Sequence, residues 1–409
     1  MKIKILNPSA LGLLHKHFLL MLCFCFFFCW AGWSESVPTL CRCTHRVPAV
    51  QPGSAFRMDY EWLAQPTDKA CTIFVHFQDS KGIVFQDDHG LSWPLSTTNW
   101  SGKITYSRRV FVPANIPEGT YDIQVGLYDP SNKKKYPLGT GMGIRSLDDQ
   151  SLAVGTMEVS RTAPGEIPDE GKPATIDFTK MKETFRDDFN EIDVSSRGPF
   201  TRWTAHTPNN KDFGDAIFTN PQSGFPFSVK DGILSIIAKK FTPRWRSGLL
   251  CSVDAEGEGF SQKFGYFELR AKLPEGTGTW PAFWLLPTDN LENAERPGVE
   301  IDIFEQYGRD PLGLHFSMHL RRLGEPTKTA TTCVGVRDTT RGFHTYGFYW
   351  DEKVMIWLFD GQEMWRLPTP PEACTPKYIL INLAMGGGWP ISETLTKTIF
   401  YVDYVRVLK

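Results

Sequence analysis

Three acidic residues stand within one otherwise apolar segment of the chain. The stretch GVEIDIFEQYG, residues 298–308, contains Glu300, Asp302 and Glu305 among isoleucines and a phenylalanine. Side chains alternate between the two faces of a strand, so Glu300 and Asp302 share one face and Glu305 falls on the other. A β-bulge between Asp302 and Glu305 would bring all three acids to one face. Because an unpaired buried carboxylate is costly, we expect that face to line a solvent-filled cleft.

Two carboxyl groups that flank a glycosidic bond can cleave it. With the bulge, Glu300 and Glu305 are about 13 Å apart along the strand at ~3.3 Å per residue. Their long side chains could lean together to about 5–5.5 Å, the carboxyl separation of a retaining glycosidase. Glu300 would then attack the anomeric carbon, while Glu305 protonates the leaving oxygen and later activates water. Asp302 would help keep a proton on one neighbour, since close carboxylates do not all ionise.

Composition narrows the class of protein. The chain has 409 residues, 41% hydrophobic and 22% charged, which is typical of a globular protein. Its net charge of −2 and lack of a long basic run argue against a nucleic-acid partner. The 13 tryptophans fit either sugar stacking at a surface or an aromatic β-sheet core.

The first residues resemble an export signal. Basic residues precede the apolar run FLLMLCFCFFFCWAG at 18–32, which is shorter than the ~20 residues of a spanning helix. Small residues follow, so we interpret residues 1–36 as a signal peptide cleaved near 31–36. An uncleaved anchor is the alternative. After cleavage we expect no stable membrane insertion, and a secreted, periplasmic or cell-surface location.

The remaining chain predicts two β-rich domains. Short strands separated by turns fill residues 37–160 and indicate an immunoglobulin-like β-sandwich. Residues 161–183 are rich in Pro, Gly and charge, which is typical of a linker. Closely spaced strands over residues 184–409 predict a single large antiparallel sandwich. The fold class is therefore all-β.

Six cysteines remain after the signal segment. An even number in an exported chain permits disulfides. We expect one bridge from Cys41 or Cys43 to Cys71, and a second from Cys333 to Cys374. The chain has no CxxC pair, so its cysteines do not indicate a zinc site.

The second domain resembles glycoside hydrolase family 16, in the laminarinase- and lichenase-like form whose ExDxxE signature is bulged. The matching motifs stand in order as FRDDFN, GYFELRAKLPEGTGTWPAFWLLP, GVEIDIFEQYG, LHFSMHL, FHTYGFYW, FDGQ, LINLAMGGGWP and YVDYVRV. The resemblance covers residues 184–409 and implies a β-jelly-roll, concanavalin-like, with a substrate cleft across its concave sheet.

The resemblance also implies residue roles. Glu300 is the nucleophile, Asp302 its assisting acid and Glu305 the acid/base. The residues implied to bind substrate are Trp284, Trp389, His319, Trp280, His315, Trp350 and Asn382. Hydrogen bonding in the cleft fits His315 and His319 better than a metal pair. Catalysis needs no cofactor, but the resemblance implies a structural Ca²⁺ held by the Asp403 carboxylate and the Gly232 backbone oxygen.

The polymer stays open at this point. Members of the family cut β-1,3- and β-1,3-1,4-glucans, red-algal galactans and bacterial exopolysaccharides. The basic residues Arg321, Arg322 and Lys328 suggest an acid-substituted polymer. We expect a monomeric, exported, retaining endo-β-glycanase. A transglycosylase, or a non-catalytic polysaccharide-recognition protein on the same fold, is the alternative.

Overall fold

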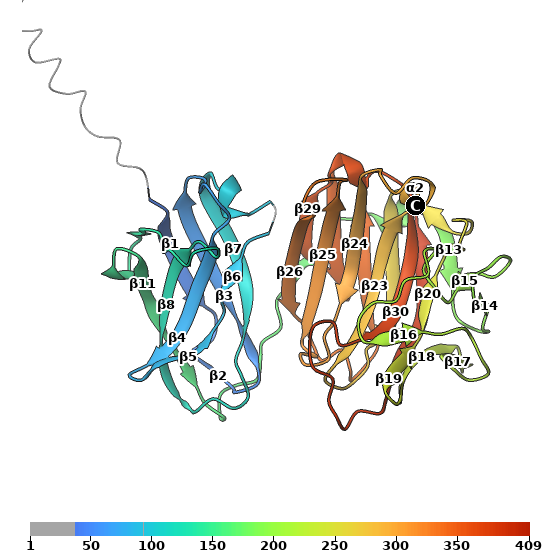
Figure 1. Ribbon diagram of the computed structural model, residues 1–409, viewed down its shortest axis with the longest axis horizontal. Helices are drawn as coiled ribbons and strands as arrows, with labels where there is room; N and C mark the ends of the chain where they lie inside the picture. Colours follow the sequence, from blue (N-terminus) through green and yellow to red (C-terminus); the bar gives the residue numbers. More distant parts are fainter. Residues whose placement is uncertain (1–36, 93) are drawn as a thin grey trace, which may run out of the picture.

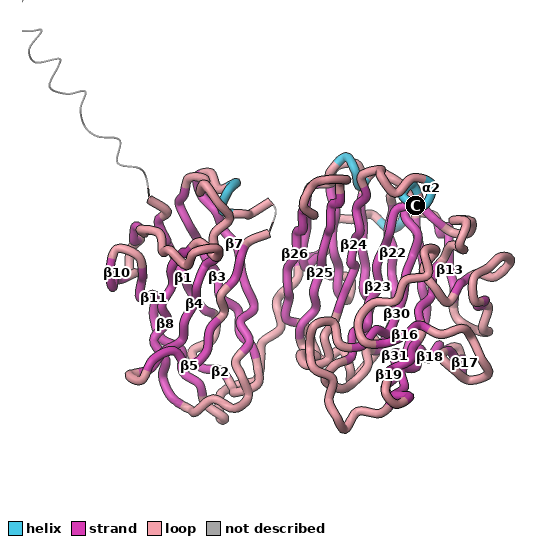
Figure 2. The backbone as a smooth tube through the Cα atoms, in the orientation of Figure 1, coloured by secondary structure: helices cyan, strands magenta, loops and turns pink. Residues whose placement is uncertain are grey.

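The computed structural model describes residues 37–92 and 94–409, so the predicted signal segment, residues 1–36, lies outside the described residues. Strands make up most of the described chain, which confirms the all-β prediction (Figures 1 and 2). The few helical turns are η1 (Thr97–Asn99), η2 (Phe178–Lys180), α2 (Asp289–Glu292) and η3 (Pro371–Ala373). Within residues 37–92 and 94–409, every helix is too short or too polar to cross a membrane.

Two sheets form the part of the chain that we call the N-terminal sandwich. The four-stranded sheet has the order β7 (Gly102–Phe111), β3 (Ala55–Ala64), β1 (Thr39–His45) and β9 (Gly139–Thr140). The seven-stranded sheet has the order β10 (Arg145–Asp148), β11 (Ser151–Val159), β8 (Gly119–Tyr128), β4 (Thr72–Asp79) and β5 (Gly82–Gln86), with β2 (Ala49–Val50) beside β11 and β6 (His89–Gly90) beside β4.

Alternating side chains build the core of this sandwich. Along β3, Met58, Tyr60 and Trp62 are buried while the residues between them are partly exposed. The Trp62 and Trp100 rings pack with their centroids 5.4 Å apart. This period-two burial follows from the pleat of a strand with one face on a core.

Two larger sheets form the part that we call the C-terminal sandwich. The eleven-stranded sheet has the order β12 (Lys172–Pro173), β29 (Gln362–Pro368), β28 (Val354–Phe359), β27 (His344–Trp350), β22 (Gly265–Lys272), β31 (Lys397–Leu408), β18 (Ile233–Phe241), β19 (Arg244–Ser247) and β16 (Ala216–Phe218), with β13 (Glu183–Asp187) beside β31 and β17 (Phe227–Lys230) beside β18. The nine-stranded sheet has the order β14 (Val194–Ser195), β15 (Trp203–Thr204), β20 (Leu249–Cys251), β30 (Lys377–Met385), β23 (Thr279–Pro287), β24 (Gly298–Glu305), β25 (Gly313–Arg321) and β26 (Lys328–Gly335), with β21 (Ser261–Gln262) beside β30.

One continuous apolar core lies between these two sheets. Ile301 and Ile303 of β24 face it from one side, and Phe348 of β27 faces it from the other. Trp350 also lies in this core, fully buried, with its ring 5.5 Å from that of Phe267. The prediction that Trp350 lines the cleft is therefore wrong. Trp350 is on the inward face of β27, in the sheet that does not carry the acids.

The segment predicted to be a linker has structure of its own. Residues 172–173 form β12, which pairs with β29 at the edge of the eleven-stranded sheet. In Figure 1 the two sandwiches lie side by side, with β7 of one facing β26 and β29 of the other. The chain between them therefore runs along the C-terminal sandwich instead of crossing free solvent.

All six cysteines of the described residues are unpaired. Neither the bridge from Cys41 or Cys43 to Cys71 nor the Cys333–Cys374 bridge is present, so both disulfide predictions are wrong for this structure. Burial raises the pKa of the Cys43 thiol and of the Cys333 thiol to about 12. Such buried thiols behave as small apolar side chains.

Candidate active site

A bulge in β24 places the three acids on one face of the nine-stranded sheet. Opposite β25, Glu300 pairs with His319 and Glu305 with His315, and the register shifts between Asp302 and Glu305. Opposite β23 the register also shifts, because Trp284 pairs with Asp302 and Phe283 with Phe304. The extra residue is Ile303, and both Ile303 and Phe304 point into the core. The bulge predicted from the spacing of the acids is therefore present.

The backbone at the bulge is held from the opposite sheet. A bulge leaves groups of the hydrogen-bond ladder without their usual partners. Trp357 of β28 reaches across the core and donates its indole N–H to the carbonyl oxygen of Asp302 at 2.9 Å. This bond satisfies a buried carbonyl and fixes the strand at the residue between the two glutamates.

Two donors hold the carboxyl group of Glu305. Trp280 Nε1 donates to Glu305 Oε1 at 2.9 Å, and the Tyr307 hydroxyl donates to the same oxygen at 3.3 Å. Burial, together with the nearby Asp302 carboxylate, nevertheless raises the pKa of Glu305 to about 7. A carboxylic acid with this pKa can carry a proton at neutral pH and give it up, which suits a general acid/base.

Asp302 lies between the glutamates and is 5% exposed. Its Oδ2 lies 3.2 Å from Nε2 of His319, and His319 Nδ1 is hydrogen-bonded to Thr329 Oγ1 at 2.8 Å. Burial, and then the charge of Glu300, raise the pKa of Asp302 well above its usual range. Burial lowers the pKa of His319, which favours the neutral imidazole beside Asp302.

Glu300 is paired with a cation. Arg321, the last residue of β25, donates from Nη1 to Glu300 Oε2 at 2.7 Å. The other carboxylate oxygen, Oε1, makes no hydrogen bond with a described residue. Arg321 and Arg322 were predicted to meet an acidic polymer, but Arg322 is also occupied, by Glu372 and Glu325.

The predicted substrate-binding residues divide into three groups. Trp280 and Trp284 lie half-buried on β23, and Asn382 Oδ1 accepts from Trp284 Nε1 at 2.7 Å, so Asn382 orients an indole from below. Trp389 is 37% exposed in the loop after β30. Trp350 lies in the core, as described above.

The loop that carries Trp389 needs its glycines. Gly387 has φ +63°, and a Cβ there would come within 2.9 Å of the rings of Trp280 and Tyr307. A Cβ on Gly386, with φ +82°, would meet the Asp215 carboxylate. The GGG sequence therefore lets the backbone approach the two side chains that hold Glu305.

His315 lines the site through its contact with Tyr307, and it is not in the group of potential metal ligands. Its ring meets that of Tyr307 edge-on with centroids 5.0 Å apart, and burial lowers its pKa to about 4. Among residues 37–92 and 94–409, the one group of three potential metal ligands is Glu300, Asp302 and His319, whose ligand atoms lie within 4.8 Å of one another. Two of these are the acids that the proposed chemistry uses.

The calcium prediction does not fit the side chains. Asp403 lies on β31, which pairs with β18 next to Gly232. Its carboxylate forms an ion pair with Arg270 of β22, so a cation already balances its charge. Arg270 therefore competes with the predicted Ca²⁺ for the Asp403 carboxylate.

Sequence reasoning missed three residues of the site. Tyr307 stands two residues after Glu305, a spacing that could have indicated the same face. Trp357 comes from the other sheet, and Phe213 comes from a distant loop, where its ring meets those of Trp280 and Trp284 edge-on. No local signal marks these last two.

Comparison with known proteins agrees with this arrangement. The family described as "Glycosyl hydrolases family 16" matches residues 229–406. "Endo-1,3-1,4-beta-glycanase EglC" of Rhizobium meliloti (strain 1021) is 34% identical over 254 residues, which are 56% of this chain and 52% of that protein. "Endo-1,3-1,4-beta-glycanase ExsH" of the same organism is 29% identical over 292 residues, 66% of this chain and 59% of that protein.

The chain thus spans between half and six-tenths of the length of these two relatives. A third relative is matched over more of its length. "Beta-glucanase" of Rhodothermus marinus is 33% identical over 199 residues, 44% of this chain and 69% of that protein. The matched region contains the bulged strand and its acids, and the chain belongs to glycosyl hydrolase family 16.

Proposed function

We propose that this chain is a retaining endo-β-glycanase that hydrolyses a β-1,3- or mixed β-1,3-1,4-linked glucan, or an exopolysaccharide with such linkages. The observation that carries the proposal is the bulge, which puts Glu300, Asp302 and Glu305 on one face of β24. The relatives named as β-glucanase and endo-1,3-1,4-β-glycanase support the substrate class.

The reaction takes place in two displacements, in which Glu300 and Glu305 have different roles. Glu300 attacks the anomeric carbon through the oxygen that Arg321 does not hold, and a glycosyl–enzyme ester forms. Glu305 gives its proton to the bridging oxygen as the glycosidic bond breaks. Glu305 then takes a proton from water, which attacks the same carbon and releases Glu300.

The surroundings give each acid its role. Glu305 has a pKa raised to about 7 by burial and by Asp302, so it holds the proton that the leaving group needs. The Arg321 cation stands beside Glu300, which must be charged to attack. Burial and the charge of Glu300 raise the pKa of Asp302 well above its usual range, so the three acids do not all ionise together and Asp302 can share a proton with its neighbours.

The remaining assignments belong to the same proposal. Residues 1–36 are an export signal, and the mature protein acts outside the cytoplasm as a monomer. Residues 37–160 are an accessory domain of immunoglobulin-like type, residues 161–183 the connection, and residues 184–409 the catalytic domain. The two-sheet arrangement of β1 to β11 supports the accessory sandwich.

Product analysis tests the activity. The chain is incubated with laminarin, mixed-linkage glucan, agarose, carrageenan and an acidic exopolysaccharide, and products are separated by chromatography. Oligosaccharides from a β-glucan, absent with Glu300→Gln and with Glu305→Gln, are expected. Retained anomeric configuration, followed by NMR, is expected for the first product.

Two other results would contradict the proposal. Products longer than an added oligosaccharide acceptor, with no net hydrolysis, would assign a transglycosylase. Tight binding of one polymer without any product would assign a recognition protein.

A further inference from the structure

A buried ion-pair group joins the two sandwiches. Arg109 of β7 donates from Nε to Glu166 Oε1 at 2.7 Å, and its Nη1 is paired with Asp310, which follows β24 by a few residues. The side chains of Arg109 and Glu166 are each 5% exposed. Breaking a buried pair by moving one partner leaves an uncompensated charge, so this contact opposes separation of the sandwiches.

A second contact holds the connecting segment in place. The Asp169 N–H donates to the carbonyl of Gly335 at 2.8 Å, and the Gly335 N–H donates to Asp169 Oδ2 at 2.9 Å. Arg57 of β3 lies 2.8 Å from Asp169 Oδ1. Asp169 thus ties the N-terminal sandwich to the end of β26.

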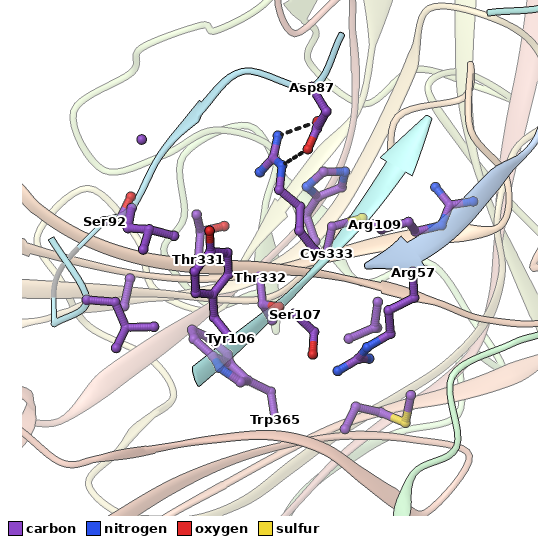
Figure 3. A pocket seen from close by; sticks show the side chains of 18 of the residues that line it. Arg57, Asp87, Ser92, Tyr106, Ser107, Arg109, Thr331, Thr332, Cys333 and Trp365 are labelled. Atoms are coloured by element: carbon purple, nitrogen blue, oxygen red, sulfur yellow. Dashed lines mark hydrogen bonds and ion pairs between the residues drawn. The ribbon is translucent and has the colours of Figure 1, made fainter. Parts of the chain in front are cut away.

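A cavity of about 630 Å³ lies between the two sandwiches. Figure 3 shows residues from both parts around it, with Arg57, Tyr106, Ser107 and Arg109 from the N-terminal sandwich and Thr331, Thr332, Cys333 and Trp365 from the C-terminal one. The volume is in the range of small-molecule sites. Neither sandwich alone would enclose this space.

The cavity shares a wall with the active site. Tyr307, whose hydroxyl donates to Glu305, lines the cavity together with His315 and Trp389. A polymer bound across β24 at Glu305 would therefore continue towards this space. The N-terminal sandwich forms the far side of that path.

Arginines outnumber acidic residues among the side chains that line the cavity, although four of the arginines are ion-paired. Five arginines and two aspartates line it, with no lysine or glutamate among the described lining residues. Both aspartates are already taken, because Asp87 accepts two hydrogen bonds from Arg108 and Asp310 is paired with Arg109. This environment contrasts with the acidic face of β24 beside it.

Arg309 is the one lining arginine that forms no ion pair with a described residue, although the charge of the neighbouring Asp310 acts on it. Its guanidinium lies 3.4 Å from the ring centroid of Trp389 and 5.3 Å from that of Phe111 of β7. It makes no hydrogen bond or ion pair with any residue of 37–92 and 94–409. Stacking on an indole fixes the plane of a guanidinium while its N–H groups stay available for a bidentate acceptor.

We propose that this interdomain cavity is a substrate subsite that takes a carboxylate-bearing substituent of the polysaccharide, with Arg309 as the residue that recognises the carboxylate. The inference rests on the proposed function, since the polymer must lie in the adjoining cleft. The N-terminal sandwich supplies the second wall through Phe111, and the Arg109 ion pairs keep that wall in place.

Affinity electrophoresis of the full chain tests the subsite. Glu300→Gln, which prevents turnover, is run through gels with soluble β-1,3-glucan or with the same glucan carboxymethylated, and Arg309→Gln and Arg309→Lys are added to it. Arg246→Gln is the matched control, because Arg246 of β19 is exposed, stacks on Phe241 of β18 and does not line the cavity. Thermal unfolding checks that each variant is folded.

Arg309→Gln is expected to weaken binding of the carboxymethylated glucan about two- to five-fold at low salt, with less effect at high salt. Arg309→Lys keeps part of the binding, and any loss on the unmodified glucan, through the contact of Arg309 with Trp389, is smaller than the loss on the carboxymethylated one. Equal loss on both polymers, no loss on either, or no binding of the carboxymethylated glucan would overturn the subsite.

Hydrolysis separates this result from the proposed function. Cleavage of unmodified glucan by the chain, with no Arg309-dependent binding of the carboxymethylated one, would reject only the subsite. Arg309-dependent binding without cleavage of any polymer would reject the glycanase and keep the subsite.

Discussion

The indole N–H of Trp280 donates to Oε1 of Glu305 at 2.9 Å, and the Tyr307 hydroxyl shares that oxygen. Both bonds favour the charged form of Glu305, yet burial and Asp302 hold its pKa at about 7. The site therefore combines a dehydrated acid with two donors that limit how far its pKa rises. The pH dependence of the reaction should report this balance.

We predict that kcat/KM falls as pH rises above about 7, tenfold per unit, because Glu305 must be protonated to act as the general acid. Tyr307→Phe removes a hydrogen bond to the Glu305 carboxylate, so the pH at which kcat/KM begins to fall should rise by roughly half a pH unit. Tyr404→Phe is the control, because that hydroxyl donates to Glu268 in the other sheet. The same pH in Tyr307→Phe as in the unmodified chain would contradict the assignment of Glu305.

The free energy of unfolding should also depend on pH through the raised pKa of Glu305. The pKa of Glu305 is raised from 4.5 to about 7 in the folded state, so between these values the folded chain binds more protons than the unfolded chain. The free energy of unfolding therefore decreases as pH rises through this window, by on the order of 3 kcal/mol from this group.

Glu305→Gln removes the titrating carboxyl group, so the pH-dependent decrease in the free energy of unfolding from this group should disappear. In urea unfolding, the variant should gain stability relative to the unmodified chain between pH 5 and pH 8, and most of the gain should appear before pH 7. Glu363→Gln, which removes a carboxylate paired with Arg366 on β29 of the other sheet, should show no such gain. A constant difference between Glu305→Gln and the unmodified chain at all pH values would show that Glu305 is not perturbed.

Chelation should leave the fold unchanged. Asp403 is neutralised by Arg270, so no Ca²⁺ is needed to balance it. We expect the same Tm with and without EDTA. A fall in Tm that added CaCl₂ restores would show that the cation displaces Arg270, since a ligand of the folded state raises its apparent stability.

The sequence predicted the part of the site that depends on neighbours along the chain. The parity of Glu300, Asp302 and Glu305 required a bulge, and Ile303 supplies it. It did not predict that Trp350 faces inward. In the strand HTYGFYW, Tyr346, Phe348 and Trp350 share one face, but alternation does not say whether an aromatic face meets the core or lines a cleft.

Contacts between distant segments could not be predicted at all. Arg109 meets Asp310 only because two sandwiches dock, and Arg321 meets Glu300 only through the register of β24 and β25. Their charges look like ordinary surface charges in the sequence. Pairing of this kind depends on the finished fold, and no local pattern encodes it.

Two buried tryptophans of one core give the last prediction. Trp357 and Trp350 are both fully buried between the sheets, 4.8 Å and 5.7 Å from the ring of Phe348. Trp357 Nε1 donates to the carbonyl of Asp302, whereas Trp350 Nε1 has no hydrogen-bond partner. Replacing either tryptophan by Phe removes a similar ring volume. Only Trp357→Phe also removes the hydrogen bond to the Asp302 carbonyl at the bulge.

Trp357→Phe should cost about 1–3 kcal/mol for the unsatisfied carbonyl in addition to the loss of packing. It should also lower kcat, because the strand between Glu300 and Glu305 loses its anchor. Trp350→Phe should lower stability through packing alone and leave kcat and KM of the folded fraction unchanged. The check is urea unfolding and steady-state kinetics of both variants at one temperature. Equal kcat in the two variants would show that the bulge keeps its shape without Trp357.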